Sequence, residues 1–272
     1  NAGTGKEVNL LTNFALGGNA LGNYSLTQPT GLIGVITPRT LSITAPMIAS
    51  KTYDGTSAAG ALAIGTLSNL VGTEVLSVAG TASARATKAV GSQAVAISYV
   101  LTNGANGGLA SNYSLANSNN IASVVTARAV TIEIGDNGNG GGGVGVTGIN
   151  AVDRVYDGSV AVALTGTAVL SGAIISGDMV SLSGTGAAQF LDKNVGTNKA
   201  VTVTGYSLSG SDAGNYAFAQ PSGLTASITP KALTITGIAV ASKAYDGGLG
   251  ASLSNDGTLS GIASGENMTP SL

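Results

Sequence analysis

The sequence predicts an all-β protein built of tandem small modules, each a β-sandwich or a β-grasp-like sheet. Three observations support this prediction. Apolar and small polar residues alternate along many segments, turn-forming residues interrupt the chain roughly every 8–12 residues, and several motifs recur with a period of 89 residues. No segment shows the apolar stripe of an amphipathic helix, and Glu and Lys are too scarce to cover the polar face of one.

Strands are expected where the alternation is clearest. Residues 164–169, 179–183 and 200–204 place Leu, Val, Ala or Met between Ser, Thr and Gly. Since successive side chains of a strand point to opposite faces, this pattern gives each strand one face in a core and one in water. Clusters of Gly, Asn, Asp and Ser, such as 209–214, separate these segments and predict turns.

Two short motifs establish the repeat. Tyr156 and Tyr216 are 60 residues apart, and Tyr216 is followed by Tyr245 after a further 29, which gives the period of 89 residues. The first motif is Tyr-Asp-Gly and the second is Asn-Tyr. Their residues are Tyr53, Asp54, Gly55, Tyr156, Asp157, Gly158, Tyr245, Asp246 and Gly247 in the first motif, and Asn23, Tyr24, Asn112, Tyr113, Asn215 and Tyr216 in the second.

The period predicts the bounds of the modules. We expect residues 1–45 to be the C-terminal part of a split repeat, 46–134 a complete repeat, 135–148 a glycine-rich linker, 149–236 a second complete repeat, and 237–272 the N-terminal part of a split repeat. Tyr113 and Tyr156 are 43 residues apart, 14 more than Tyr216 and Tyr245, and the glycine-rich linker accounts for this surplus. Insertions persist at linkers and loop tips because no backbone pairing is lost there.

Both ends of the chain align with the middle of a repeat. Residues 1–6 align with 194–199, and residues 271–272 align with 181–182. Two alternatives follow: the chain is a segment of a longer array, or the split repeat is completed by another chain. In the second case copies would assemble head to tail, because a heterologous contact that does not close propagates into a fibre.

Composition excludes several classes of function. The chain has 272 residues, no Cys, no His and no Trp, 9% charged residues and a net charge of −2. It therefore has no thiolate nucleophile, no Ser–His pair, no zinc site of the usual kind and no disulfide. Its 11 Lys and Arg residues are spread along the chain and form no basic patch for nucleic acid. No run of 18 or more apolar residues predicts a membrane span.

The Tyr-Asp-Gly motif predicts a structural turn rather than a reactive site. Carboxylates that share acid–base work must lie close together, but Asp54, Asp157 and Asp246 belong to three different modules. The alternative is a strand that ends in an Asp-Gly turn, with the Tyr buried and the Gly supplying a positive φ. We therefore expect no catalytic, cofactor-binding or metal-binding residue.

The Asn-Tyr motif predicts a corner in which the tyrosine hydroxyl bonds a nearby backbone group. Asn23 and Asn112 also match the glycosylation pattern, but Asn215 does not, so we interpret these matches as incidental. Three other aromatic residues lie in corresponding strands upstream of the motif and are expected to anchor the core: Phe14, Tyr99 and Tyr206.

Two further chemical interpretations fail on residue type. Within 135–148, the positions that an EF-hand loop counted from Asp136 requires are Asp136, Gly138, Gly140 and Thr147, and only Asp136 has a suitable side chain, which favours a linker. Lys51 and Lys243 precede the Tyr-Asp-Gly motif where a Lys–Asn cross-link could form, but Arg154 at the equivalent position cannot form one.

Five segments recur in the same order and together resemble a known family. They are Ser-Lys-Ala-Tyr-Asp-Gly (242–247), Asn-Val-Gly-Thr-Asn-Lys-Ala-Val (194–201), Ala-Gly-Asn-Tyr (213–216), Gln-Pro-Ser-Gly-Leu-Thr-Ala (220–226) and Ile-Thr-Pro-Lys-Ala-Leu-Thr-Ile (228–235). These segments resemble the YDG/MBG repeat modules of long bacterial surface proteins, many of which are similar to filamentous haemagglutinins. The resemblance implies an extracellular β-rich spacer or adhesive module with no catalytic residues to carry over.

The sequence therefore predicts an extracellular structural stalk or filament, in a bacterial adhesin or matrix fibre at the cell surface, and not an enzyme. Its expected partners are other copies of itself or adjacent repeats of a longer chain. The alternative is an adhesin module that binds a glycan or another surface. The enlarged loop 99–112, with Tyr99 and Asn103, is the first candidate for that role.

Overall fold

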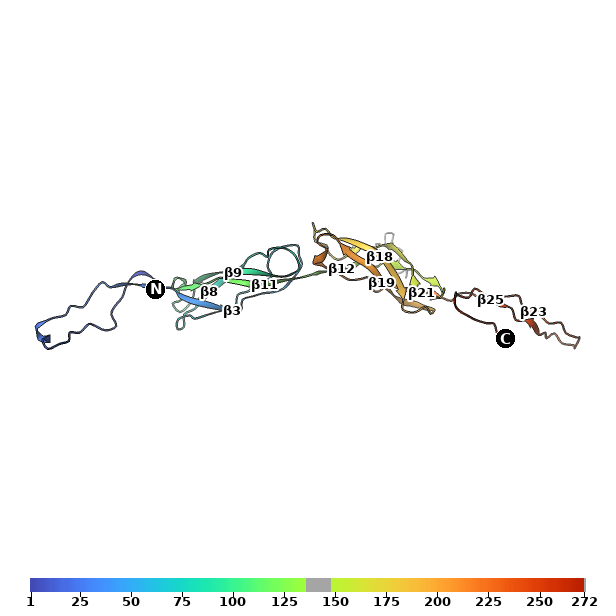
Figure 1. Cartoon of the computed structure of the whole chain (residues 1–272), viewed down its shortest axis with the longest axis horizontal. Helices are drawn as coiled ribbons and strands as arrows, with labels where there is room; N and C mark the ends of the chain where they lie inside the picture. The colour runs from blue at the N-terminus through green and yellow to red at the C-terminus, as the bar shows by residue number, and fades with distance from the viewer. Residues whose placement is uncertain (136–147, 272) are drawn as a thin grey trace. The chain divides into compact units, whose positions relative to one another are not determined.

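The computed structural model describes residues 1–135 and 148–271 (Figure 1). The described residues form strands and contain no α-helix. Three short 3-10 turns are present: η1 (Leu21–Asn23), η2 (Ala110–Asn112) and η3 (Ala213–Asn215). The chain divides into two compact units, unit 1 (Asn1–Ala127) and unit 2 (Arg128–Leu272). The prediction of an all-β protein made of tandem modules is confirmed.

The larger sheet of unit 1 has the strand order β5-β11-β9-β8. Its strands are β5 (Lys51–Thr52), β8 (Leu76–Ala82), β9 (Gly91–Asn103) and β11 (Ser118–Thr126). β9 pairs antiparallel with both β8 and β11, whereas β5 pairs parallel with β11. Because β5 ends directly before Tyr53, this parallel pair positions the first Tyr-Asp-Gly motif.

A smaller sheet of unit 1 has the order β10-β3-β7. Its strands are β3 (Arg39–Thr44), β7 (Thr66–Ser68) and β10 (Tyr113–Leu115), and a separate pair joins β4 (Met47–Ile48) to β6 (Leu62–Ala63). β10 pairs parallel with β3, with Tyr113 opposite Arg39. The Asn-Tyr motif thus enters this sheet through a strand that begins at its tyrosine.

Unit 2 repeats both arrangements. Its sheets have the orders β14-β21-β19-β18-β15, β17-β12-β20 and β13-β16. The bounds are β12 (Arg128–Ile132), β13 (Gly148–Ala151), β14 (Arg154–Val155), β15 (Ala161–Val162), β16 (Leu164–Thr167), β17 (Leu170–Ser171), β18 (Ser181–Phe190), β19 (Gly196–Ser209), β20 (Tyr216–Phe218) and β21 (Thr225–Thr229). β12 pairs parallel with β20, and β14 pairs parallel with β21. The two complete modules therefore share topology as well as motifs.

The core of the second complete module follows the predicted alternation. Val201 and Val203 are buried, whereas Thr202 and Thr204 are exposed. The two valines pack in one cluster with Ile132, Ile149, Val162, Phe190, Leu224, Ala226 and Ile228. A smaller cluster in unit 1 contains Leu41, Leu76 and Tyr113. Removal of this apolar surface from water is the main force that holds the strands together.

The three expected core anchors differ in burial. Tyr206 packs against the cluster of the second module, and Tyr99 is half-buried. Phe14 is 61% exposed, so the prediction is wrong for this residue. Phe14 lies in an N-terminal segment whose described part forms only a two-stranded sheet, which leaves its side chain uncovered.

A bulge shapes the ladder between β18 and β19, where the register shifts after Gly184. Gly184 has a φ of +85°, and a Cβ there would lie 2.1 Å from the carbonyl oxygen of Gly205. Only glycine fits such a close approach of two backbones with a left-handed φ.

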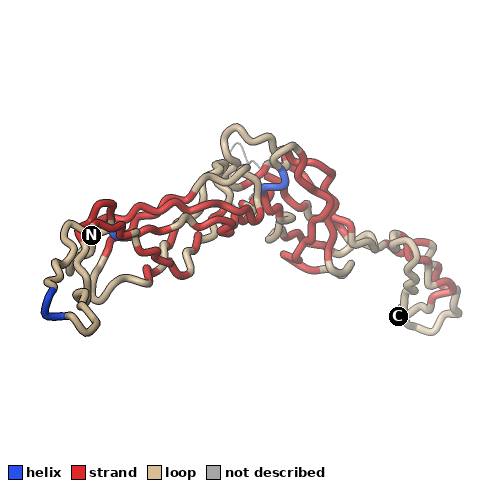
Figure 2. Tube along the Cα trace, turned by 60° about the vertical axis from the view of Figure 1, so that its left-hand side comes forward, coloured by secondary structure: helices blue, strands red, loops and turns tan. Residues whose placement is uncertain are grey.

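The terminal segments form two-stranded antiparallel pairs. The pairs are β1 (Gly3–Glu7) with β2 (Ile33–Ile36) in unit 1, and β22 (Thr234–Thr236) with β25 (Thr258–Ser260) and β23 (Ala239–Val240) with β24 (Leu253–Asn255) in unit 2. Figure 2 shows that loops make up most of both segments. Many of their large apolar side chains are exposed, including Leu11, Tyr24, Ile33, Ile238 and Leu249.

The observed sheets place two strands in a different module from the one that the expected module bounds give them. β3 lies before residue 46, yet it pairs with β7 and β10 of the module that follows. β12 lies before residue 149 and pairs in the same way with β17 and β20. The compact units divide between Ala127 and Arg128. The pairing thus favours a module start at the Thr-Pro-Arg-like segment, and the expected bounds 46–134 and 149–236 stay predictions.

The glycine-rich segment expected to be a linker has bonded flanks. The amide of Gly135 donates to the Ile149 oxygen at 2.9 Å, and the amide of Ile149 donates to the Glu133 oxygen at 3.0 Å. Gly148 has a φ of +119°, and a Cβ there would lie 2.7 Å from the Glu133 oxygen. Residues 136–147, on which the linker prediction depends, lie outside the described residues.

Candidate functional site

The Tyr-Asp-Gly motif forms the same turn in all three copies. The Asp carboxylate bonds a basic side chain three residues earlier, at 2.9 Å for Lys51–Asp54 and for Lys243–Asp246, and Arg154 bonds Asp157 likewise. The same carboxylate accepts the backbone amide two residues later, at 2.8–3.0 Å. The Gly of each copy has a φ between +74° and +84°. Side chain and backbone together thus close a rigid loop.

These contacts keep the three carboxylates ionised. Hydrogen bonds from Lys51 and from the Thr56 amide lower the pKa of Asp54 to about 2. Bonds from the Ser159 amide and from Arg154 lower the pKa of Asp157 to about 2, and Lys243 lowers the pKa of Asp246. A carboxylate held in this way is a poor proton donor or acceptor near neutral pH.

The motif tyrosines differ strongly in burial. Tyr53 is 0% exposed and its amide donates to the Thr126 oxygen at 2.8 Å. Tyr156 is half-buried and its amide donates to the Thr229 oxygen at 2.9 Å. Tyr245 is 98% exposed, contrary to the expected burial. Among the described residues, no strand equivalent to β11 or β21 pairs with the residues before Tyr245.

The Asn-Tyr motif bonds a backbone amide and, in addition, a carboxylate that the sequence reasoning missed. The Tyr113 hydroxyl accepts the Val71 amide at 3.1 Å and donates to Glu74. The Tyr216 hydroxyl accepts the Ile175 amide at 3.0 Å and donates to Asp178 at 2.7 Å. The Glu74 carboxylate, followed by burial, raises the pKa of Tyr113.

One signal could have identified these carboxylates. Each lies one or two residues after a glycine at a repeat-equivalent position, in Gly-Thr-Glu (72–74), Gly-Asp (177–178) and Gly-Glu (265–266). The chain has only 13 Asp and Glu residues among 272. An acidic residue at the equivalent position of every repeat therefore indicates a structural role that the repeats share. We call Glu74, Asp178 and Glu266 the repeat acids.

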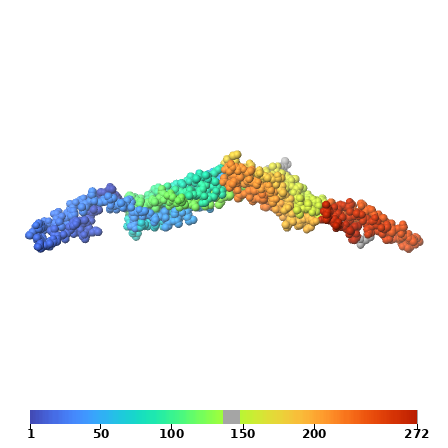
Figure 3. All heavy atoms as spheres, viewed as in Figure 1, coloured from blue at the N-terminus to red at the C-terminus, as the bar shows by residue number. Residues whose placement is uncertain are grey.

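The repeat acid Glu266 forms a junction between the second complete module and the segment that follows it. Its carboxylate accepts the Tyr156 hydroxyl and bonds the Lys193 ammonium at 2.5 Å. Lys193 and then Tyr156 lower the pKa of Glu266, whereas Glu266 raises the pKa values of both partners. The last residues of the chain, in dark red, lie against this module in Figure 3. We call Tyr156, Lys193 and Glu266 the junction triad.

Packing supports the junction triad. Gly158 has a φ of +84°, and a Cβ there would lie 3.3 Å from the Ala263 side chain and 3.9 Å from the Glu266 carboxylate. Ala263 itself is only 6% exposed. The Tyr-Asp-Gly turn of one repeat is therefore in direct contact with the repeat acid of the next.

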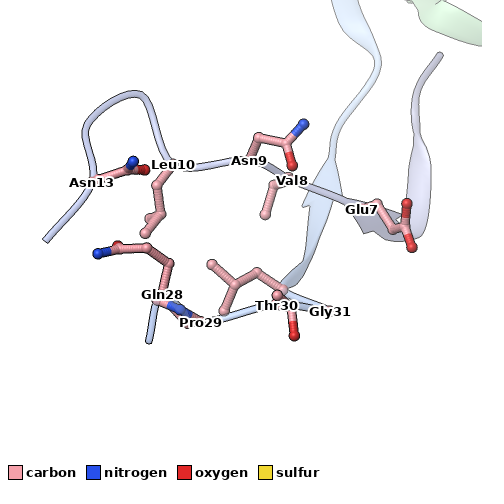
Figure 4. Close-up of a pocket in the computed structure, with 10 residues that line it drawn as sticks. Glu7, Val8, Asn9, Leu10, Asn13, Gln28, Pro29, Thr30 and Gly31 are labelled. Atoms are coloured by element: carbon pink, nitrogen blue, oxygen red, sulfur yellow. The ribbon is translucent and has the colours of Figure 1, made fainter. Parts of the chain in front are cut away.

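A hollow in the N-terminal segment lies between residues 7–13 and 28–32 (Figure 4). Gln28 closes it, because its side chain bonds the Phe14 amide at 2.9 Å and the Phe14 oxygen at 2.8 Å. Gln220 makes the equivalent bond to the Tyr206 oxygen at 2.6 Å in the second complete module. The hollow thus corresponds to the interior of a module and offers no cluster of charged groups.

The loop 99–112, expected to be the first candidate for glycan binding, uses its named residues internally. The Tyr99 hydroxyl bonds the Ser118 hydroxyl at 2.9 Å, and the Asn103 side-chain Oδ1 accepts the Ala110 amide at 2.9 Å. These contacts tie both side chains to neighbouring residues of the same module.

No group of three or more His, Cys, Asp or Glu side chains among the described residues could hold a metal ion. No helix in that part of the chain is long and apolar enough to cross a membrane.

A family model for the YDG domain matches residues 37–121 and 143–223. Together these two matches cover more than half of the chain. The chain belongs to the YDG domain family. Searches of curated proteins and of solved structures found no match. The match confirms the recognition of tandem YDG repeats. Each of the two YDG domains contains one complete pair of motifs, Tyr-Asp-Gly followed by Asn-Tyr.

Proposed function

We propose that this chain is a structural element of an extracellular bacterial surface protein, a segment of a stalk or filament in an adhesin or matrix fibre. The observation that carries the proposal is the junction triad, in which the Tyr-Asp-Gly turn of one repeat binds the repeat acid of the next. The Tyr-Asp-Gly motif here joins two consecutive repeats, and this is the contact that a stalk built of tandem modules requires. Membership of the YDG family supports the same role.

The chemistry of the motifs also supports a structural rather than an enzymatic role. The motif Asp residues are held ionised by neighbouring cations and amides. The hydroxyls of Tyr113, Tyr156 and Tyr216 bond the carboxylates of the repeat acids. Groups paired in this way stabilise turns and junctions, and they lack the poised pKa that general acid–base catalysis requires.

Single-molecule pulling on the two ends of the chain tests the proposal. Each complete module should unfold in a separate event that lengthens the chain by roughly 25–30 nm, because an 89-residue repeat extends at about 3.4 Å per residue. Extension at negligible force, or one event for the whole chain, would contradict a modular stalk.

The adhesive alternative needs its own measurement. Incubation of the labelled chain with a glycan array should give no binding above that of an unrelated all-β protein. Binding that a shortened 104–109 loop abolishes would replace the structural proposal with the adhesive one, since that deletion leaves the motifs and the repeat acids in place.

A further inference from the structure

The lysine of the junction triad lies in a loop between two strands. Lys193 belongs to the loop 191–195, which joins β18 to β19, and its ammonium bonds Glu266 at 2.5 Å. The Lys193 side chain is 45% exposed. An exposed ion pair contributes little when long side chains must be ordered to form it. The bond to Glu266 therefore depends on how firmly the loop holds Lys193.

A second lysine holds the backbone on both sides of Lys193. The Lys199 ammonium donates to the Asp192 carbonyl oxygen at 3.2 Å and to the Asn194 carbonyl oxygen at 2.6 Å. It also bonds the Asp192 carboxylate at 2.5 Å, and this carboxylate accepts the Asn194 amide at 2.8 Å. Lys199 thus binds the residue before Lys193 and the residue after it. We call Lys199 and Asp192 the loop clamp of the second module.

The first complete module has a lysine at the equivalent position of the corresponding loop. Lys88 lies in the loop 83–90, between β8 and β9, and precedes Gly91 by three residues. Lys193 likewise precedes Gly196 by three residues. Each glycine begins the long strand of its sheet, β9 or β19, so the two loops are equivalent.

Different side chains hold the loop of the first module. The Gln93 Oε1 accepts the Thr87 amide at 3.0 Å, and its Nε2 donates to the Thr87 hydroxyl at 2.8 Å. The Arg85 guanidinium donates to the Ala89 oxygen at 2.9 Å. Thr87 and Ala89 are the residues before and after Lys88. Arg85 and Gln93 thus form the loop clamp of the first module.

Gln93 and Lys199 occupy the same position in their sheets. Gln93 is opposite Ser123 in the ladder of β9 and β11, and Lys199 is opposite Ala226 in the ladder of β19 and β21. Both partners lie three residues before the threonine that accepts the motif tyrosine amide. Lys199 is one residue further along its strand than Gln93, and the register shift between Gly196 and Lys199 absorbs this residue. The bulge therefore brings Lys199 to the position of Gln93.

Arg85 takes the place that Phe190 has in the second module. The Arg85 amide donates to the Ser57 oxygen at 2.8 Å and the Phe190 amide to the Val160 oxygen at 2.9 Å, and each acceptor lies four residues after its motif tyrosine. Arg85 and Phe190 are both buried. The Lys199 ammonium lies 5.6 Å from the centre of the Phe190 ring, within the range of a cation–π interaction. One clamp therefore places its cation beside a buried ring, and the other places its cation where that ring would be.

We propose that Lys199 is a positioning residue, which holds the backbone around Lys193 so that the lysine ammonium reaches the carboxylate of Glu266. The loop clamp of the first module holds the backbone around Lys88 in the same way. Removing a cation from water costs free energy, and both modules accept this cost to hold the same two backbone positions. A loop held before binding loses less conformational entropy when its lysine binds a carboxylate.

This inference rests on the proposed function, in which the junction triad joins one repeat to the next. The two fail separately. Pulling experiments without separate unfolding events would overturn the modular stalk and leave the loop clamps intact. A bond between Lys193 and Glu266 that does not depend on Lys199 would overturn the positioning role and leave the stalk intact.

A double-mutant cycle read by carboxyl NMR titration tests the positioning role. Lys193 lowers the pKa of Glu266, so Lys193→Met should raise that pKa in the unaltered chain. In the Lys199→Met background the same substitution should raise it by less than half as much, because the unclamped Lys193 no longer reaches the carboxylate. The direct effect of the Lys199 charge on Glu266 is common to both members of the second pair and cancels from the comparison.

Two further variants control this cycle. Lys243→Met removes the same charge from another lysine that bonds a carboxylate and a carbonyl oxygen, those of Asp246 and Gly248, and it should leave the effect of Lys193→Met unchanged. Lys199→Arg keeps a cationic donor at the clamp and should restore that effect. An equal effect of Lys193→Met in the unaltered and Lys199→Met backgrounds would overturn the proposal. Lost amide protection at 201–203 in Lys199→Met would also overturn it, since Lys199 would then hold the whole module together.

Hydrogen exchange tests the loop clamp of the first module. Gln93→Leu should speed exchange of the amides of 87–89 roughly tenfold or more and leave 95–97 protected, because it removes the side chain that bonds Thr87. Ser92→Ala changes the exposed neighbour of Gln93 on the same strand and should leave exchange at 87–89 unchanged. Equal exchange at 87–89 in Gln93→Leu and in the unaltered chain would overturn the proposal for the first module.

Discussion

The second complete module and the N-terminal segment 1–36 contain the same repeat sequence but bury it differently. Val201, Leu224 and Ile228 belong to a closed cluster in the complete module. In the N-terminal segment, Val8 is 40% and Ile36 46% exposed. Tyr216 is 6% exposed in its corner, whereas Tyr24 is 72% exposed. The comparison teaches that the alternating pattern specifies which residues can form a core, and that strands distant in sequence decide whether a core forms.

The largest expected effect contrasts two phenylalanines. Phe190 is 2% exposed in the cluster of the complete module, and Phe14 is 61% exposed. Phe190→Ala should lower the free energy of unfolding by about 3–5 kcal/mol, because it removes buried surface and leaves a cavity. Phe14→Ala should change it by less than about 0.5 kcal/mol. Urea unfolding of both variants measures the difference, and similar losses would mean that the N-terminal segment shares a core with the rest of unit 1.

The next effect contrasts two glycines with left-handed φ. Gly184 has φ +85° with a backbone oxygen 2.1 Å from its would-be Cβ, and Gly31 has φ +69° with open space. Gly184→Ala should destabilise the second module by about 1–3 kcal/mol, through strain and displacement of the ladder. Gly31→Ala should leave the Tm of that module unchanged, and a shift of equal size in calorimetry would contradict this contrast.

A smaller effect concerns the junction triad. Glu266→Gln should speed hydrogen exchange at residues 262–266 and leave residues 200–203 protected, because the charge that holds Lys193 is lost. Glu7→Gln is the control, since Glu7 is exposed and makes no ion pair among the described residues. Unchanged exchange at 262–266 would show that packing of Ala263 suffices without the carboxylate.

The junction triad also predicts a pH dependence. The folded junction lowers the pKa of Glu266, so its contribution is present above the ordinary value near 4.5 and is lost as the pH falls through the lowered value. The folded junction raises the pKa of Tyr156, so that contribution is present below 10.0 and is lost as the pH rises through the raised value. The protection factors of residues 262–266, which correct the exchange rates for the intrinsic effect of pH, should fall at both extremes, and protection factors that do not change at low pH in Glu266→Gln are the matching control.

The smallest effect concerns a single turn. Lys51→Met should raise the pKa of Asp54 from about 2 toward its ordinary value, because Lys51 supplies the strongest of the bonds that lower it. The Thr56 amide remains, so the recovery should be incomplete. Carboxyl NMR titration measures it, with Lys231→Met as the control, and an unchanged pKa would assign the effect to the backbone amide.

Sequence reasoning succeeded where the determinant is local. The alternation of Val201–Thr204 and the turn at Tyr156–Gly158 follow from side-chain period and from the conformational freedom of glycine. It failed where residues far apart meet. The parallel pairing of Arg39 with Tyr113 has no local signal. The bond from Tyr156 to Glu266, 110 residues away, depends on how one repeat meets the next.

Burial of the motif tyrosines shows the same limit. Tyr53 and Tyr245 stand in closely similar local sequences, Lys-Thr-Tyr-Asp-Gly and Lys-Ala-Tyr-Asp-Gly, and both make the Lys–Asp turn. Tyr53 is 0% and Tyr245 98% exposed. No property of five residues distinguishes them, because burial requires the strand that receives the tyrosine amide.

Hydrogen exchange of the dilute, monomeric chain tests the central comparison most directly. The account predicts strong protection of the amides of 201–203 and 224–228, and fast exchange at 8–10 and 33–36, although the two sets are repeat equivalents. Equal protection of the two sets would contradict it, since the N-terminal segment would then possess a core of its own.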